Sequence, residues 1–249
     1  MWLEDHGYSP NYVADVDIAR DPGLATGART LLFSGHGEYW TGSMRDAAET
    51  AAAGGTSLAF LGANQAFWQV RLAADALGRP GRTIVCYKSA LLDPLAASGP
   101  GTSTSRFEQP PVNRPPARLM GLGYGGVVTG IRPLIVGPGI RAFDPGSGLQ
   151  AGEALPGLVA DEIDQVPPGF DGVLLGATPL TVTEHPGTVV AGAALWLGPT
   201  GNRVFDAGTF DFSWGLDPRY SAALPGFPAT AFEELMARIL AWLGAQPGR

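Results

Sequence analysis

The chain has 249 residues, 45 % of them hydrophobic, and a formal net charge of −7. We expect one domain over residues 1–249, because this length can bury one large core. The acidic balance, with no cluster of Lys or Arg, argues against nucleic-acid partners and anionic membrane surfaces, since both need a positive face. A single cysteine, no long apolar stretch and no leader-like start predict a cytoplasmic protein without disulfides or membrane spans.

The N-terminal segment predicts a short helix before any strand. Residues 2–6 match the end of a helix that Gly7 stops, and residues 12–16 are expected to form the strand after it. A doubly wound domain normally begins with a strand. We therefore expect the first strand to be missing from this chain or to be supplied later.

A strand, a helix and a second strand are predicted between residues 30 and 61. The strands are the apolar runs 30–33 and 57–61, and the helix between them keeps an apolar stripe of Met44, Ala47, Ala48, Ala51 and Ala52. Ser43 and Asp46 have the spacing of a capping box, and Gly54-Gly55 ends the helix. Such a βαβ unit has parallel strands and a right-handed crossover. The expected fold class is α/β, with a three-layer, mostly parallel doubly wound sheet.

Chemistry-bearing residues gather at the two corners that follow these strands. The first corner carries His36, Glu38 and Tyr39, and the second carries Asn64. In an open parallel sheet, both corners lie at the edge where ligands bind. We therefore expect these four side chains within reach of one another.

The remaining sequence predicts further strands and one closing helix. Partial alternation in 67–72 and 82–88 predicts antiparallel additions at a sheet edge or a small β-subdomain, so a β-rich insertion is expected around 67–157. Residues 94–116, rich in Gly, Ser, Thr and Pro, predict a long loop. Strands are expected at 173–182 and 189–197, and a helix opened by a capping box at Thr230 and Glu233 closes the domain.

Conventional nucleophiles are disfavoured by their positions. Asn64 stands where a nucleophile elbow would carry Ser or Cys, so a glutaminase-like cysteine triad is not expected. Cys86 lies within an apolar strand pattern, where an inert packed thiol is the usual outcome. Ser34 and His36 are too close in the chain to reach the geometry of proton abstraction.

Metal binding is a second hypothesis. His6, His36 and His185 lack the spacing of a zinc site. Oxygen donors remain at two places in the chain: Glu38, Tyr39, Asp161, Glu162 and Asp164. Hard oxygen donors suit a hard cation, but a packed ring for Tyr39 and a solvated or ion-paired carboxylate for Glu162 remain alternatives.

An ordered series of motifs resembles a known family. The series is Gly35-His36-Gly37-Glu38-Tyr39-Trp40, Met44-Arg45-Asp46, Gly54-Gly55, Leu61-Gly62-Ala63-Asn64, Phe67-Trp68, Arg203-Val204-Phe205-Asp206-Ala207-Gly208-Thr209 and Trp214-Gly215-Leu216. It resembles the C-terminal domain of the large (β) subunit of N,N-dimethylformamidase over most of the chain. The resemblance implies a fold like that of class I glutamine amidotransferases without their cysteine. It also implies that the chain assembles with a small partner subunit or with copies of itself. Because the chain begins part way through the family pattern, we expect either a stand-alone relative or a fragment of a longer protein.

The family enzyme is an amidohydrolase whose iron, a single ferric ion, is held by two tyrosines and a glutamate. The resemblance assigns Tyr39 as one phenolate ligand and Glu162 as the carboxylate ligand. The second tyrosine is harder to assign. Relatives carry an aromatic pair before the tryptophan that follows the Gly-x-Asn corner, but this chain has Ala66-Phe67-Trp68, and a phenylalanine cannot bind a metal. Tyr124 or Tyr87 would then have to supply the second phenol.

The implied function is metal-dependent hydrolysis of a small amide. The ferric ion would polarise the carbonyl and supply hydroxide near neutral pH. His36 or Glu38 would act as general base or orient the water, and Asn64 would donate a hydrogen bond to the oxyanion. The alternatives are a non-catalytic binding or scaffolding domain of the same fold, which Phe67 favours, and a glutaminase-type hydrolase, which requires an exposed Cys86 near a histidine.

Overall fold

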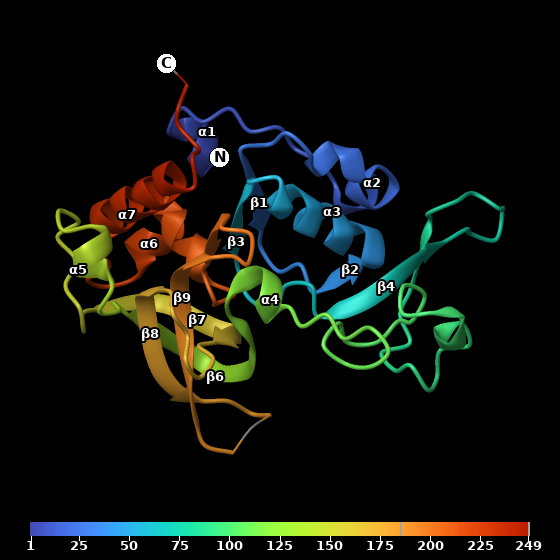
Figure 1. The fold of residues 1–249 in the computed structure, drawn as a ribbon. Coiled ribbons are helices and arrows are strands. Elements are labelled where there is room, and N and C mark those ends of the chain that lie inside the picture. The colour runs from blue at the N-terminus through green and yellow to red at the C-terminus, as the bar shows by residue number, and fades with distance from the viewer. Residues whose placement is uncertain (185, 249) are drawn as a thin grey trace.

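The computed structural model describes residues 1–184 and 186–248, so His185 lies outside the described residues. Within them, seven strands form the main sheet and three form a small one (Figure 1). The main sheet has the order β1 (Thr30–Ser34), β3 (Ser57–Leu61), β10 (Arg203–Asp206), β9 (Thr188–Leu197), β7 (Ala154–Gln165) and β6 (Gly123–Ile135). The seventh strand, β8 (Val173–Thr181), pairs with β9.

The prediction of a mostly parallel doubly wound sheet is wrong. Within the described part of the main sheet, only β1, β3 and β10 run parallel to one another, and β9, β8, β7 and β6 pair antiparallel. The reason is connection length: β8 ends at Thr181 and β9 starts at Thr188. Parallel strands need a crossover of about a dozen residues or more, whereas a short link joins antiparallel neighbours. The predicted strands at 173–182 and 189–197 exist, but as a hairpin.

The predicted βαβ unit is confirmed. Strands β1 and β3 are parallel in direct register, and α3 (Gly42–Ala53) connects them. The helix begins earlier than the capping pattern predicts, because Thr41 is the N-cap and its Oγ1 accepts the backbone N–H of Met44 at 3.1 Å. A short strand that was not predicted, β2 (Tyr39–Thr41), ends at Thr41, and the helix begins at the next residue. Ser43 therefore lies inside the helix and is not its N-cap.

Helices cover both faces of the parallel part of the sheet. Leu58, Phe60 and Val204 lie in the apolar cluster that contains the α3 residues Met44 and Ala48. The alternate positions, which point to the other face of a strand, pack against α7 (Ala229–Trp242): Ala59, Leu61 and Phe205 share a cluster with Leu235 and Ile239. The closing helix is confirmed, although Pro228 is its N-cap and no side chain caps it.

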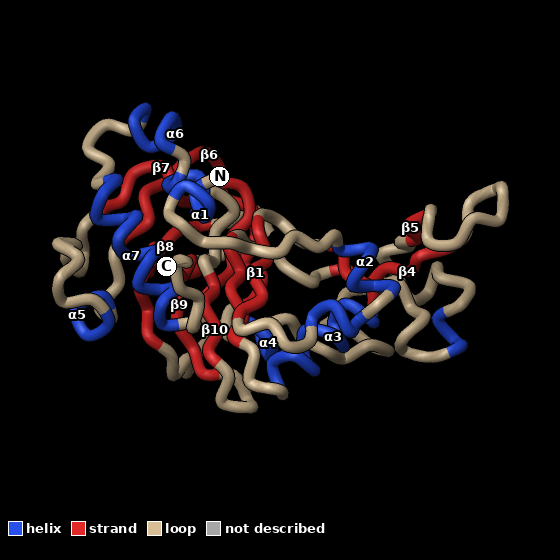
Figure 2. The backbone as a smooth tube through the Cα atoms, turned by 90° about the horizontal axis from the view of Figure 1, so that it is seen from above, coloured by secondary structure: helices blue, strands red, loops and turns tan. Residues whose placement is uncertain are grey.

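The small sheet consists of β2, β4 (Trp68–Ala73) and β5 (Thr83–Val85). Strand β4 pairs parallel with β2 and antiparallel with β5. In both views, β4 and the loops around it extend away from the main sheet (Figures 1 and 2). The alternation in 67–72 and 82–88 therefore marks a small β-subdomain, as one of the two alternatives predicted.

Short helices make up the rest. The expected strand at 12–16 is wrong, because α2 (Asp15–Arg20) starts there and places two acidic residues at its N-terminus and an Arg at its C-terminus, where the helix dipole favours them. The others are α1 (Trp2–Asp5), η1 (Pro22–Ala25), η2 (Ala96–Ser98), α4 (Ala117–Met120), α5 (Ile140–Phe143), η3 (Phe212–Leu216) and α6 (Pro218–Ala223). Among the described residues, no helix has the length and apolar character that crossing a membrane requires.

Candidate functional site

The corners after β1 and β3 are in contact. A Cβ atom on Gly62 would lie 2.3 Å from the carbonyl oxygen of Gly35, so only glycine allows this approach. Asn64 adopts a left-handed backbone conformation with φ 53°, which asparagine tolerates better than most residues. The prediction that the two corners lie side by side is confirmed.

Strand β7 brings a third element to these corners. The segment after β10 pairs with β7 through Phe210 N–H to Glu162 O at 3.1 Å and Asp164 N–H to Gly208 O at 2.8 Å. This pairing places the Glu162 carboxylate next to Asn64, whose Nδ2 donates to Glu162 Oε2 at 3.1 Å. Residues separated by about a hundred positions in the sequence thus share one corner.

His36 lies between two carboxylates. Its Nδ1 donates to the carbonyl oxygen of Ala63 at 3.0 Å, since a carbonyl can only accept. Its Nε2 is 3.1 Å from Oε2 of Glu162 and 3.6 Å from Oε2 of Glu38. The Nδ1 bond fixes the tautomer and leaves Nε2 as the atom that gains and loses a proton. All three side chains are largely but not fully buried.

Tyr39 lies beside this cluster but makes different contacts. Its side chain is 40 % exposed, and Nζ of Lys88 lies 5.2 Å from its ring centroid and 5.0 Å from that of Trp68. The hydrogen bond with Tyr39 raises the pKa of Lys88. Lys88 is the only lysine of the chain and was not predicted as a site residue.

Phe67 and Tyr124 pack against each other at the same corner, with their ring planes tilted by 56°. The Phe67 ring is buried, and its centroid is 4.9 Å from that of Tyr124. The Tyr124 hydroxyl donates to Oε1 of Glu184 at 3.2 Å. Burial, together with the negative charges of Glu162 and Glu184, raises the pKa of Tyr124. Tyr124 is therefore a protonated hydrogen-bond donor in this arrangement.

Two buried carboxyls behind the corner were not predicted as a pair. Asp164 Oδ1 accepts the backbone N–H of Asn64 at 3.0 Å, and Asp206 Oδ1 accepts that of Gly208 at 2.9 Å. Within the described part of the chain, the second oxygen of each has no hydrogen-bond partner. Burial raises the pKa of Asp164 to about 7 and also raises that of Asp206, which the charge of Asp164 raises further. At least one of the two is therefore protonated near neutral pH.

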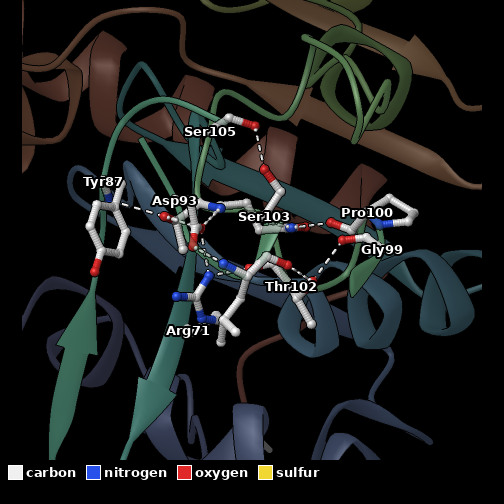
Figure 3. Close-up of polar contacts among 11 residues, drawn as sticks. Arg71, Tyr87, Asp93, Gly99, Pro100, Thr102, Ser103 and Ser105 are labelled. Carbon is white, nitrogen blue, oxygen red and sulfur yellow. Dashed lines mark hydrogen bonds and ion pairs between the residues drawn. The ribbon is translucent and has the colours of Figure 1, made fainter. Parts of the chain in front are cut away.

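A buried carboxylate, Asp93, organises the loop that carries Lys88 (Figure 3). Its Oδ2 accepts from Nη1 of Arg71 at 2.5 Å and from both the N–H and the hydroxyl of Thr104 at 2.7 Å. Thr104 Oγ1 in turn accepts the N–H of Tyr87 at 2.9 Å. Burial alone would raise the pKa of Asp93, but these donors hold it well below its usual range. The network fixes the residue next to Lys88.

Cys86 shows no sign of activation. The thiol is partly buried, and burial raises its pKa. A reactive cysteine needs a lowered pKa. These observations favour the inert thiol over the glutaminase-type alternative.

A family model described as N,N-dimethylformamidase beta subunit-like, C-terminal, matches residues 1–223. The chain belongs to this family. No curated protein matches the sequence. The motif series that supports the resemblance includes the His36 and Asn64 corners, so the family match covers the cluster described above.

The ferric ion that the family resemblance implies would need two phenols and a carboxylate at one point. Over residues 1–184 and 186–248, no group of three or more His, Cys, Asp or Glu side chains has the geometry to hold a metal ion. Tyr39 contacts Lys88, whereas the Glu162 carboxylate contacts His36 and Asn64. Phe67 has no donor atom. The position that Phe67 occupies therefore does not fit the two-tyrosine, one-glutamate set that the resemblance implies.

Proposed function

We propose that this domain hydrolyses the C–N bond of a small amide at the His36 corner. The observation that carries the proposal is the position of His36 Nε2 between two carboxylates, with Nδ1 tied to the backbone. The family name supplies the substrate class, because N,N-dimethylformamide is a small amide. The same name describes a beta subunit, and we extend to this chain the proposal that it assembles with another subunit.

His36 has the geometry of a general base that later becomes a general acid. Nε2 takes a proton from water, and the resulting hydroxide oxygen bonds to the carbonyl carbon. The imidazolium formed is stabilised by the Glu162 carboxylate 3.1 Å away. As the C–N bond breaks, the imidazolium returns its proton to the leaving nitrogen, which gives a carboxylic acid and an amine.

Asn64 and Glu38 support this proton transfer: Asn64 positions Glu162, and Glu38 lies near His36 Nε2. The Asn64 amide holds Oε2 of Glu162, so in this arrangement it orients the carboxylate and does not face an oxyanion. Glu38, with its Oε2 3.6 Å from Nε2, offers the protonated ring a second acceptor. Lys88 and Tyr39 provide donors beside the corner that can stabilise negative charge on the carbonyl oxygen.

The test is the release of ammonia from formamide and acetamide, and of dimethylamine from N,N-dimethylformamide, by the purified protein. We expect His36→Gln and Glu162→Gln to lower kcat by about 100-fold or more, the usual contribution of acid–base catalysis. His6→Gln is the matched control, since His6 lies in the N-terminal segment against Glu233. Turnover that survives both corner variants would contradict the proposal, and a wild-type protein inactive on all three amides would favour the scaffolding alternative.

A further inference from the structure

A second cavity lies away from the His36 corner. It occupies about 310 Å³ between α3, α4 and the turn that joins β9 to β10. Its lining includes Arg45, Glu49, Arg114, Arg118, Thr200 and Asn202. None of these residues belongs to the cluster around His36, so this cavity is a separate feature.

Arg45 lines this cavity, and its buried guanidinium has one nitrogen without a hydrogen-bond acceptor among the described residues. Arg45 is 1 % exposed; its Nε donates to Oε1 of Glu49 at 2.7 Å and its Nη2 to the carbonyl oxygen of Pro115 at 3.2 Å. Among the described residues, its Nη1 has no acceptor. A buried donor without a partner destabilises the folded protein, and more so when it is charged. The buried charge of Arg45 attracts an anion in the adjacent cavity, because Coulomb attraction needs no direct contact.

Positive charge exceeds negative charge around the cavity. Nη2 of Arg114 pairs with Asp46 at 2.8 Å and with Glu49 at 2.7 Å. Arg118 is exposed, and no carboxylate within residues 1–184 and 186–248 pairs with it. Three guanidinium groups therefore face two carboxylates, which leaves one positive charge in a protein whose net charge is −7.

We propose that this cavity binds a small molecule through one oxyanion group, a phosphate or a carboxylate, which Arg118 contacts and the buried charge of Arg45 attracts. Guanidinium groups match the planar, paired oxygens of both anions. The volume lies at the lower end of the range for ligand sites, about 300–1,000 Å³, which fits a metabolite-sized anion. Arg114 remains with Asp46 and Glu49 and forms the wall of the site.

The experiment is calorimetric titration of the full chain with inorganic phosphate and, separately, with succinate, at constant ionic strength maintained with chloride. We expect saturable binding of at least one anion and none of chloride. The arm that binds identifies which oxyanion the site prefers. Arg118→Gln should weaken binding at least tenfold, and because Arg118 has no ion pair in the described chain, this variant should fold normally.

Arg141→Gln is the matched control, since Arg141 is an exposed arginine on α5, remote from the cavity lining. It should bind the anion as the wild type does. His36→Gln should also retain binding, so loss of the proposed amide hydrolysis and loss of anion binding are separable. Equal weakening by the Arg118 and Arg141 substitutions, or no saturable binding of either anion, would overturn the proposal.

Discussion

Asn64 donates its backbone N–H to Oδ1 of Asp164 across 3.0 Å, which ties the corner after β3 to β7. The same two elements meet again where the Asn64 side chain holds Glu162. A fully buried carboxyl therefore sets the position of the residues around His36. Its protonation state depends on Asp206, the second buried carboxyl.

This pair predicts that stability falls as the pH rises. Because burial raises the pKa of Asp164 to about 7 and also that of Asp206, the folded protein keeps a proton that the unfolded chain releases above about pH 4. The pair's contribution to the free energy of unfolding is therefore full below about pH 4 and is lost as the pH rises to about 7. Asp206→Asn keeps an acceptor for Gly208 and offers Asp164 a permanent donor, so the decline should be smaller in this variant. Urea unfolding at pH 5 and pH 8 measures it.

The exposed Asp17 on α2 gives the control for that comparison. Asp17→Asn should leave the wild-type pH dependence unchanged. If the free energy of unfolding of Asp206→Asn falls as much between pH 5 and pH 8 as that of the wild type, the buried pair does not cause the loss of stability.

Asp93 predicts the opposite pH dependence. Its pKa is held low, so its contribution to stability is present above about pH 4 and is lost as the pH falls further. Asp93→Asn weakens a buried ion pair with Arg71 and should cost about 3 kcal/mol at neutral pH. The variant should also be cleaved faster by protease within residues 87–105. Glu108→Gln, which alters an exposed ion pair with Arg106, should cost less than about 1 kcal/mol. Equal costs for the two variants would contradict the structural role given to the buried Asp93 carboxylate.

The donor set at the corner predicts the response to iron. Phe67 provides no oxygen, so the wild-type protein should stay colourless after loading with ferric ion, while Phe67→Tyr, which adds a phenol beside Tyr124, should gain a visible phenolate band. Tyr39→Phe in the Phe67→Tyr background should remove that band. A coloured wild-type protein that loses its colour in Tyr39→Phe would show instead that the existing donors hold the ion.

The start of α3 gives a prediction on stability. Thr41→Val keeps the shape of the side chain but removes the oxygen that accepts the Met44 N–H, and it should cost about 1 kcal/mol. Thr50→Val changes the same residue type on the exposed side of the same helix and should cost less. Thermal unfolding followed by circular dichroism compares the two, and equal losses would argue against Thr41 as the cap.

Local patterns predicted the parallel part of the fold and the closeness of the two corners. The apolar runs at 30–33 and 57–61, with Gly54-Gly55 between them, fix a βαβ unit by chain connectivity alone. Strand direction in the rest of the sheet depends on loop length and long-range pairing, and an apolar run such as 189–197 fits either direction. The predicted parallel sheet failed for this reason.

The candidate site shows the same division. His36, Glu38, Tyr39 and Asn64 were predicted to lie together because they follow adjacent strands. The observed contacts join His36, Glu38 and Asn64 through Glu162, whereas Tyr39 contacts Lys88. The Asp164 and Asp206 pair depends on how the segment after β10 pairs with β7, which no local pattern determines. Their one sequence signal is an aspartate near the end of each of two apolar strands.

Lys88 has a practical consequence for any laboratory that handles this protein. Lys88 carries the one side-chain amine in these 249 residues, so a lysine-directed reagent modifies this domain at that position. Attachment to a resin or a sensor surface through Lys88 would therefore place the support next to Tyr39. A ligand that binds beside Tyr39 would then have less access to the protein. Attachment through the C-terminus keeps that region free.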